Sequence, residues 1–318
     1  MPDAPLGLRQ HRAVMDPFVS VMIPTWNNAD ELLQCLASLR ELDYPREQLE
    51  IVIFDNGSHD DTAKRVESLF ADMRREGWAR LVLARGSRNL GAFGGRAAAL
   101  HSLGRGGEFV LSLDDDVVVT PECLRRLVAS AADGAAVVGA RIVYDDAPDE
   151  VASGAGYFNR WLGTYREHRP AVRTACDFVT SCGCLLRREP LESVGGFDPT
   201  YFTSHGDVDL CLTLRERGFT VLYEPAAVIR HKVARGGTRV PERIYYVYRN
   251  KLLVLRKHLP RGRRPLVFAL YAVGWLPRAI VGSLIRHRAV RRQELRAILL
   301  AVRDGLLDRR GETPGFRP

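Results

Sequence analysis

Short apolar segments alternate with helix-like segments along the first two-thirds of the chain, and this alternation most constrains its fold. The segments FVSVMI (18–23) and LEIVIF (49–54) are short, β-branched and mostly apolar, as buried parallel strands are. Residues 30–41, between them, repeat leucine at the spacing of one helical face. Two more pairs of this kind follow, 79–84 with 94–103 and 108–113 with 121–132. The series predicts an α/β fold with a mostly parallel central sheet flanked by helices.

The formal net charge of +8 indicates an acidic partner: nucleic acid, an anionic membrane or a phosphate-bearing substrate. The distribution of the basic residues helps to decide among these three. Arginine is concentrated in the last quarter, in RKHLPRGRR and RHRAVRR. A nucleic-acid-binding surface more often spreads basic residues among aromatic ones, so we expect no nucleic acid but an anionic membrane or a phosphate-bearing substrate. The six cysteines include no CxxC pair, and the N-terminus lacks the apolar segment of a signal peptide. We therefore expect reduced thiols and a cytoplasmic location.

Polar or glycine-rich residues follow each of the four expected strands. The first strand is followed by PTWN (24–27), the second by DNGS (55–58), the third by SRNLGAFGG (87–95) and the fourth by an aspartate triplet (114–116). In sheets of this kind ligands bind at the carboxyl ends of the strands. We therefore expect these segments to line one cleft.

The aspartate triplet calls for a cation or a basic partner, because neighbouring carboxylates repel one another. An Asp-x-Asp pair at a strand end offers oxygen ligands to Mg²⁺ or Mn²⁺, whereas in an exposed turn the same residues would only be solvated. Asp207 and Asp209 open a predicted helix (208–217), where plain capping is the alternative. His231 ends a predicted strand and by itself fits a core histidine better than a metal ligand. The chain contains no G-x-G-x-x-G and no Walker motif.

The last part of the chain has a different character. Residues 145–176 lack a clear period and suggest loops or a small antiparallel region. A helix is expected at 242–258. Residues 266–285 are apolar but interrupted by Pro277-Arg278, so we expect a helical hairpin in the headgroup region of a membrane rather than a spanning helix. The alternative is a buried or dimer-forming pair of helices.

Seven segments occur in the order found in one enzyme family: VMIPTWNN, IVIFDNGSHDDT, GSRNLGAFGGRAAAL, LSLDDDVVV, SCGCLLRR, VGGFDPTYFTSHGDVDLCLTLRERGF and AAVIRH. With these segments, about residues 18–255 resemble the family 2 inverting glycosyltransferases of the GT-A fold, most of all the rhamnosyltransferase and galactofuranosyltransferase-like branch. The resemblance implies an N-terminal arm (1–17), a catalytic domain (18–240) with a nucleotide-sugar-binding half (18–120) and an acceptor half (121–240), and a helical, basic C-terminal extension (241–318).

The resemblance also implies roles for individual residues. The nucleotide-sugar side would be formed by Pro24, Thr25, Asn27, Asp55, Arg88, Asn89, Gly94, Asp114 and Asp115. The metal, Mg²⁺ or Mn²⁺, would be bound by Asp116 with Asp114 and His231. Asp207 would be the catalytic base. The acceptor side would include Cys182, Gly183, Trp161, His205 and Asp209. The family usually has an acidic residue where this chain has Gly206, which leaves Asp207 as the only candidate base of this motif.

These roles imply a metal-dependent, inverting hexosyltransferase of cell-wall or polysaccharide biosynthesis. It would move a sugar from a dTDP- or UDP-sugar to a hydroxyl group of a glycan, lipid-linked or natural-product acceptor. It would lie peripherally on the inner face of the cell membrane, and its C-terminal helices could form a homodimer. Two alternatives stay open: a haloacid-dehalogenase-type phosphohydrolase, which also places Asp-x-Asp after a strand, and a GT-A scaffold that binds without turnover. A sugar nucleotidyltransferase would need a G-x-G-T-R loop where this chain has PTWNN.

Overall fold

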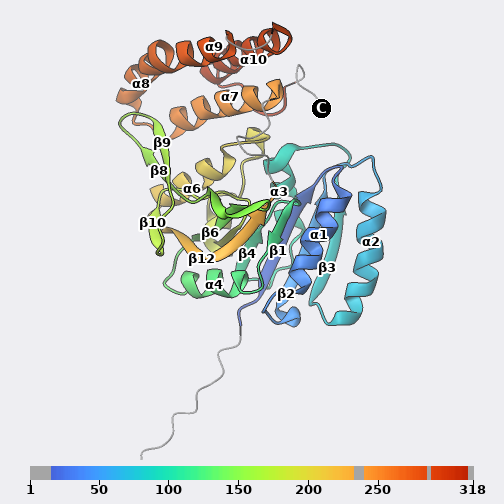
Figure 1. The fold of residues 1–318 in the computed structure, drawn as a ribbon. Helices are drawn as coiled ribbons and strands as arrows, with labels where there is room; N and C mark the ends of the chain where they lie inside the picture. The colour runs from blue at the N-terminus through green and yellow to red at the C-terminus, as the bar shows by residue number, and fades with distance from the viewer. Residues whose placement is uncertain (1–15, 233–239, 285–287, 314–318) are drawn as a thin grey trace, which may run out of the picture.

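The computed structural model describes residues 16–232, 240–284 and 288–313, and its centre is a mixed sheet with a parallel half (Figure 1). In the order β10-β12-β6-β11-β4-β1-β2-β3, the strands β4, β1, β2 and β3 run parallel, whereas β11 runs antiparallel to both neighbours. The strands are β1 (Val19–Thr25), β2 (Leu49–Asp55), β3 (Arg80–Arg85), β4 (Phe109–Ser112), β6 (Val137–Tyr144), β10 (Thr174–Cys176), β11 (Cys184–Arg187) and β12 (Val221–His231). Short β5 (Val117–Val119) pairs with β12, and β7 (Ala147–Ser153) pairs with β6. Most of the expected N-terminal arm, residues 1–15, lies outside the described residues.

Both faces of the sheet are covered by helices, which explains why β1 and β2 are buried along their whole length. On one face Val21 and Ile51 share a hydrophobic core with α1, α2 and α4, and on the other Met22 shares a second core with α3, α5 and α6. These helices are α1 (Ala29–Arg40), α2 (Thr62–Met73), α3 (Gly91–Ser102), α4 (Cys123–Ala131), α5 (Arg188–Ser193) and α6 (Gly206–Glu216). Short 3₁₀ turns lie at Arg46–Gln48, Arg74–Glu76, Pro199–Tyr201 and Arg261–Arg263. The predicted mostly parallel sheet flanked by helices is confirmed.

The small antiparallel region expected within residues 145–176 is also present. β8 (Ala155–Asn159) pairs with β9 (Thr164–His168) as a separate two-stranded sheet. Its turn lies against the C-terminal helices, because a Cβ atom on Gly163 would stand 2.7 Å from Val267 and 2.8 Å from Leu255. The hairpin thus connects the sheet domain to the helices beyond it (Figure 1).

The chain from Pro241 onward forms a helical layer at one end of the sheet domain (Figure 1). This layer comprises α7 (Pro241–His258), α8 (Arg264–Leu270), a π-helical turn (Tyr271–Trp275), α9 (Leu276–Leu284) and α10 (Arg288–Leu306), which packs along α7. The helical hairpin expected within residues 266–285 does not turn at Pro277-Arg278, since α8, the π turn and α9 follow one another without a break. Pro277 has no N–H to donate to Val273, and the π turn that contains Val273 widens the helix there, so the helix continues through the proline.

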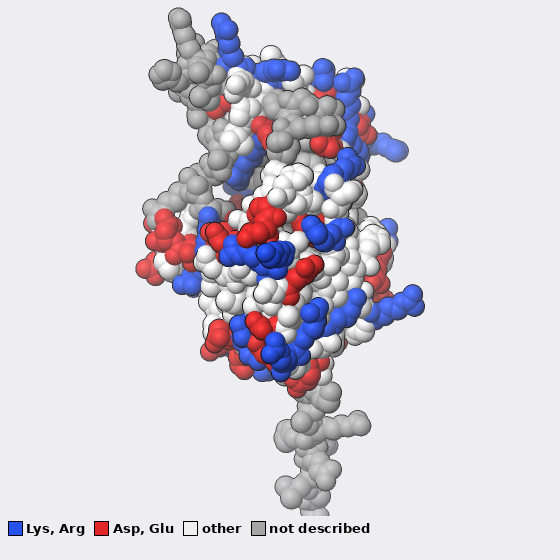
Figure 2. Space-filling view, turned by 90° about the vertical axis from the view of Figure 1, so that its right-hand side faces the viewer, with Lys and Arg blue, Asp and Glu red and all other residues white. Residues whose placement is uncertain are grey.

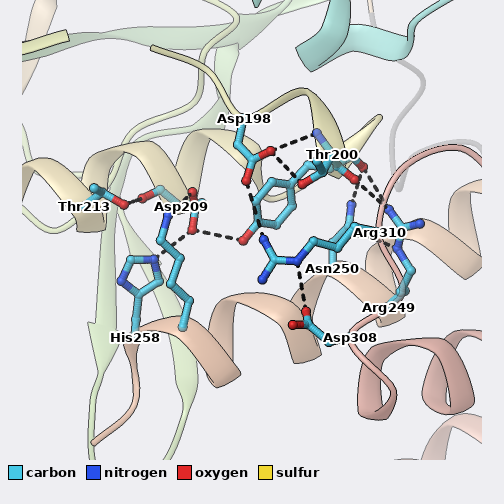
Figure 3. Close-up of polar contacts among 11 residues, drawn as sticks. Asp198, Thr200, Asp209, Thr213, Arg249, Asn250, His258, Asp308 and Arg310 are labelled. Carbon is cyan, nitrogen blue, oxygen red and sulfur yellow. Dashed lines mark hydrogen bonds and ion pairs between the residues drawn. The ribbon is translucent and has the colours of Figure 1, made fainter. Parts of the chain in front are cut away.

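Polar side chains of α7 fasten this layer to the segment that precedes α6 (Figure 3). The amide nitrogen of Asn250, which is fully buried, donates to the carbonyl oxygens of Tyr201 and Ser204 at 2.8 and 2.9 Å, and also to that of Thr203. Arg249 donates to the carbonyl of Tyr201 at 3.3 Å. The backbone before α6 therefore depends on α7 for its hydrogen bonds.

Asp209 belongs to the same interface. Its carboxylate accepts from Lys257 Nζ at 2.8 Å, lies 2.9 Å from His258 Nε2 and accepts from the Tyr201 hydroxyl at 2.9 Å (Figure 3). The residue is 3% exposed. This acid, which the sequence analysis assigned to the acceptor side, thus holds α6 against α7.

Candidate active site

The carboxyl ends of β1, β2 and β4 and the start of α3 surround a cavity of about 530 Å³. Six of the residues predicted for the nucleotide-sugar side line it: Pro24, Thr25, Asn27, Asn89, Asp114 and Asp115. The other lining residues are Trp26, Asn28, Asn56, Gly91, Ala92, Arg96, Phe202, Thr203 and Glu242. The expectation that the strand ends meet in one cleft is therefore confirmed, and the segment before α6 and the start of α7 also contribute to it.

Three residues predicted for the nucleotide-sugar side do not line this cavity. Arg88 lines an adjacent hollow of about 330 Å³, and Gly94 lines another of about 220 Å³. Asp55 is fully buried, and its carboxylate accepts from the backbone N–H of Ser58 at 2.8 Å and from Nε of Arg85 at 3.2 Å. Both carboxylate oxygens of Asp55 thus have protein partners, which explains how an acid can lie inside the sheet edge.

The basic partner of the aspartate triplet is Arg96, a residue that the sequence analysis did not single out. Its side chain is 2% exposed and forms an ion pair with Asp114. It also donates to the hydroxyl of Ser112 at 3.1 Å and to the carbonyl of Ser181 at 3.4 Å. The signal that could have found it is an arginine inside an otherwise small and apolar helix, GAFGGRAAALHS. Such a residue needs a buried acidic partner.

His231 approaches the same aspartates from the end of β12. Its Nε2 lies 2.9 Å from Asp116 Oδ1 and 3.8 Å from Asp114 Oδ2, and its Nδ1 lies 3.2 Å from Sγ of Cys182. Burial by itself would lower the pKa of His231, but the hydrogen bond to Asp116 and the charges of the aspartates raise this pKa above its ordinary value. The structure thus brings together all three residues predicted to bind a metal.

A divalent cation fits the chemistry of this group. The ligand atoms of Asp114, Cys182 and His231 lie within 4.8 Å of one another. Burial raises the pKa of the Cys182 thiol well above its ordinary value, so the neutral thiol is a poor ligand. The two carboxylates of the Asp-x-Asp pair and the imidazole are ligands that suit Mn²⁺, and the carboxylates also suit Mg²⁺. Asp115 instead accepts from the Thr25 hydroxyl at 2.6 Å, and burial raises the pKa of Asp115 to about 6.

Asp207, the predicted base, is connected to the aspartate cluster through the backbone of one residue, Ser181. Its Oδ2 accepts from the N–H of Ser181 at 3.4 Å, and its Oδ1 accepts from the N–H of Val208 at 2.9 Å. The carbonyl of Ser181 in turn accepts from Arg96. Burial raises the pKa of Asp207 above its ordinary value. A carboxylate with a raised pKa is a stronger base once it is ionised.

The segment that leads to Asp207 has an unusual backbone. Phe202, Ser204 and His205 have φ angles of 59°, 62° and 66°. Non-glycine residues in this region cost about 1–3 kcal/mol each and persist only where the surroundings hold them. Here the Asn250 amide binds the carbonyls of the segment, and the Phe202 ring stacks on Tyr246 with centroids 4.9 Å apart. Since Phe202 also lines the cavity, this strained segment joins the donor side to the start of α6.

Gly206 has no room for the acidic residue that the resemblance suggests at this position. A Cβ atom there would lie 2.6–2.7 Å from ring atoms of Phe93. Phe93 is buried and packs on Phe197 with ring centroids 6.3 Å apart, so it cannot move aside without opening the core. Glycine is therefore a packing requirement, and Asp207 is the acid at the start of α6 that is not tied to α7.

Two further acceptor-side predictions fall in different places. Gly183 lies where β11 begins, and a Cβ atom on it would stand 2.6 Å from Cδ1 of Ile229, so glycine allows close packing on β12. Trp161 is 64% exposed in the turn of the β8–β9 hairpin, with the guanidinium of Arg263 4.1 Å from its ring centroid. The structure thus places Trp161 on the surface, against the start of the apolar helix.

Known proteins resemble this chain in sequence. A family model described as "Glycosyl transferase family 2" matches residues 20–195. Glycosyltransferase AglE of Haloferax volcanii is 24% identical over 266 residues, which are 82% of this chain and 82% of that protein. An N-acetylglucosaminyl-diphospho-decaprenol L-rhamnosyltransferase of Mycobacterium tuberculosis is 38% identical over 85 residues, 26% of this chain and 27% of that protein. Curated relatives differ in length, and the matches cover from 26% to 82% of them.

A solved structure shares the fold. The mannosyltransferase PcManGT of Pyrobaculum calidifontis, in complex with GDP-Man and Mn²⁺, superposes with a TM-score of 0.60 at 19% sequence identity. The match covers 93% of this chain and 88% of that one. Together with the family match and the order of the strands, this likeness confirms the GT-A fold expected from the sequence.

The ion pair between Arg96 and Asp114 predicts a large effect on stability. We expect Arg96→Met to lower the free energy of unfolding by about 3–5 kcal/mol, because it leaves the Asp114 carboxylate beside two other acids without its buried partner. Urea unfolding followed by circular dichroism measures the change.

A second variant separates the charge from the packing. Adding Asp114→Asn to Arg96→Met should recover most of the loss, since the partly buried charge of Asp114 is then removed with its partner. The control is Arg126→Met, which removes an arginine from an exposed pair with Glu122 and should cost about 1 kcal/mol or less. If Arg96→Met is no more destabilising than Arg126→Met, the pair does not hold the cluster.

Proposed function

This chain belongs to glycosyl transferase family 2, and we propose from that premise that it transfers a sugar from a nucleoside-diphosphate sugar to an acceptor hydroxyl group with inversion at the anomeric carbon. The observation that carries the proposal is the link through Ser181, whose backbone N–H donates to the candidate base Asp207 and whose carbonyl accepts from Arg96 of the aspartate cluster. An inverting displacement needs a donor site and a base on opposite sides of one reacting carbon, and no enzyme nucleophile.

The cavity suits a nucleoside diphosphate. Its volume of about 530 Å³ lies within the range of small-molecule sites. Uncharged polar side chains (Thr25, Asn27, Asn28, Asn56 and Asn89) line the part formed by the ends of β1 and β2 and the segment before α3, where they can bind a base and a ribose. Asp114 and Asp115 lie at the end of β4, and Glu242 contributes a further carboxylate from the start of α7. The proposed nucleotide is UDP or dTDP.

Asp114, Asp116 and His231 would hold Mg²⁺ or Mn²⁺. When bound, the cation supplies positive charge that stabilises the diphosphate as a leaving group. The presence of Mn²⁺ in the complex of PcManGT supports the same choice of ion here.

Asp207 would accept the proton of the acceptor hydroxyl. As this oxygen forms its bond to the anomeric carbon, the bond from that carbon to the diphosphate breaks, and the proton passes to the Asp207 carboxylate. The raised pKa of Asp207 supports this role. Neither alternative function is favoured: the fold and family match those of sugar transferases, and a silent binding protein would not need this base.

The acceptor is proposed to be lipid-linked, as the nature of the C-terminal helices suggests. Among the described residues, Arg261–Val281 forms one helix whose length and composition would allow it to cross a membrane, with a mean hydropathy of 1.2. It exposes Leu266, Leu270, Val273 and Val281. On the face shown in Figure 2, Lys and Arg side chains stand out at the upper end and edges of the helical layer, with some Asp and Glu side chains among them. We propose that this layer lies on the inner face of the cell membrane, each basic residue near the surface contributing about 1 kcal/mol.

Vesicle binding tests the membrane proposal. Leu266→Asp with Leu270→Asp should abolish cosedimentation with anionic vesicles, because both side chains are about half exposed and their replacement adds charge to the apolar face. The pair Asp149→Asn and Glu150→Gln, which is exposed on β7, is the control. A protein that forms dimers without lipid and loses them in the Leu266→Asp, Leu270→Asp variant would instead support the pairing of two copies through these helices.

Replacement of the base predicts a loss of turnover without a loss of donor binding. Asp207→Asn should lower kcat by about 10²- to 10⁴-fold, while the affinity for the nucleotide sugar stays within a few-fold of the native value. In the native enzyme kcat should fall as the pH drops, since protonated Asp207 accepts no proton, and the raised pKa places this fall at a higher pH than an ordinary aspartate would. Sugar transfer to a lipid extract gives the rate, and calorimetry gives the affinity. Native turnover in Asp207→Asn would remove this residue from the role.

Loss of the metal ligand predicts a loss of donor binding. UDP or dTDP should raise the Tm of the native protein more with Mn²⁺ than with chelator, because ligands stabilise the folded state that binds them. Asp116→Ala should lose this difference, whereas Asp149→Ala, at an exposed acid, should keep it. A thermal-shift titration measures both. An Asp116→Ala protein with the full response to Mn²⁺ would contradict the metal site.

A further inference from the structure

Polar groups without partners surround Lys251 of α7. Its Nζ lies 5.4 Å from the ring centroid of Tyr165 and 5.6 Å from those of Tyr271 and Trp275, and it forms no ion pair with any residue that the structure describes. The Tyr165 ring lies 5.7 Å from the His205 ring. Three buried atoms of these neighbours have no hydrogen-bond partner: the hydroxyls of Tyr165 and Tyr271 and Nδ1 of His205.

Buried polar atoms without hydrogen-bond partners lower the stability of the folded protein unless a ligand supplies those partners. A buried polar atom without a partner costs about 1–3 kcal/mol, and folded proteins contain few of them. Here three occur around one lysine whose ammonium is contacted only by rings. All four groups can donate a hydrogen bond, so the chemistry they share suits an anion with several acceptor oxygens.

The position of Lys251 indicates which anion. His205 is two residues before the candidate base Asp207, and Tyr165 belongs to the β8–β9 hairpin on the same side. Tyr271 and Trp275 belong to the π turn of the apolar helix, which exposes Leu270 and Val273. The lysine therefore lies between the place where the acceptor hydroxyl is needed and a surface that suits a lipid chain.

We propose that Lys251, Tyr165, Tyr271 and His205 bind a phosphate group of a lipid-linked acceptor. The inference rests on the proposed function in one respect, namely that the acceptor hydroxyl meets Asp207. The phosphate would be held next to His205 and the lipid chain would lie along the exposed side of the apolar helix. Lys251 and the two tyrosines are thus assigned to acceptor binding, and none of them touches the donor cavity.

Binding of a short prenyl phosphate tests the site in the full-length protein. Calorimetry with farnesyl monophosphate should show an affinity at least about 10-fold weaker for Lys251→Met than for the native protein, which matches one charge-assisted hydrogen bond. Lys251→Arg should keep part of it. Arg261→Met, which removes an exposed cation from the start of the apolar helix (Arg261–Val281), should bind as the native protein does. Equal affinity of the native protein and Lys251→Met would overturn the site.

The two hydroxyls give a test that a merely structural role would fail. Tyr165→Phe and Tyr271→Phe should each weaken the binding of farnesyl monophosphate several-fold while leaving Tm unchanged or raised, because the hydroxyls have no protein partner to lose. A marked drop in Tm with unchanged affinity would mean that the hydroxyls serve folding, and the proposal would be wrong.

Further ligands identify the source of the phosphate. Farnesol should bind much more weakly than farnesyl monophosphate, and inorganic phosphate should displace the latter only at much higher concentration. If inorganic phosphate binds as tightly as farnesyl monophosphate, the lipid-linked source is wrong. If farnesol does so, the phosphate site is wrong.

Sugar transfer separates this inference from the proposed function. Lys251→Met should raise KM for the lipid acceptor with little change in the affinity for the nucleotide sugar. If the native protein binds farnesyl monophosphate through Lys251 but transfers no sugar, the phosphate site is supported and the proposed function is wrong. Native KM for the lipid acceptor in Lys251→Met would overturn the site and leave the function standing.

Discussion

Repulsion among three neighbouring carboxylates at the end of β4 is the constraint on which the site depends. The groups that offset it come from three elements: Arg96 from α3, His231 from the end of β12 and Thr25 from β1. Because an unpaired buried charge is costly, these elements must meet for the strand end to fold as it does. The same contacts fix the position of α3 against β4, where the cavity proposed for the donor opens. The aspartates thus organise the site before any cation is bound.

The C-terminal helices also hold the backbone segment that leads to the candidate base, Asp207. Asn250 and Arg249 of α7 bind the carbonyl groups of a backbone segment that has three left-handed residues and ends at the start of α6. A segment with this geometry would relax without such partners, and Asp207 would move with it. Helices that face the membrane in our proposal therefore also position the candidate base. Movement of this layer on a lipid surface would be transmitted to the segment through the side chains in Figure 3.

The fold was predictable from local signals, whereas the partners of the charged residues were not. β1 and β2 are apolar at nearly every position because both faces of the sheet are covered, and this pattern is visible in the sequence alone. The sequence around Arg96 gave little indication of its role, since Arg96 lies on α3 and its partner Asp114 follows β4. The resemblance assigned Asp55 to the nucleotide-sugar side, and nothing near Asp55 in the sequence shows that Arg85 of the next strand pairs with it. Pro277 lacks the N–H that a helical residue donates, as expected, but the preceding π turn accommodates the proline and the helix does not end there.

Gly206 shows how the acceptor side of this chain differs from what the resemblance suggests. The ring of Phe93 occupies the space that an acidic side chain would need, so the start of α6 offers an acceptor little beyond Asp207. The groups proposed to bind the acceptor phosphate lie instead on other elements. Tyr165 is on β9, His205 in the segment before α6, Lys251 on α7 and Tyr271 in the π turn. In this proposal, acceptor recognition would depend on the β8–β9 hairpin, the segment before α6 and the C-terminal helices. Under the same proposal one fold could serve different acceptors, because the strand ends would build the donor site and the hairpin and helices that pack on them would build the acceptor site.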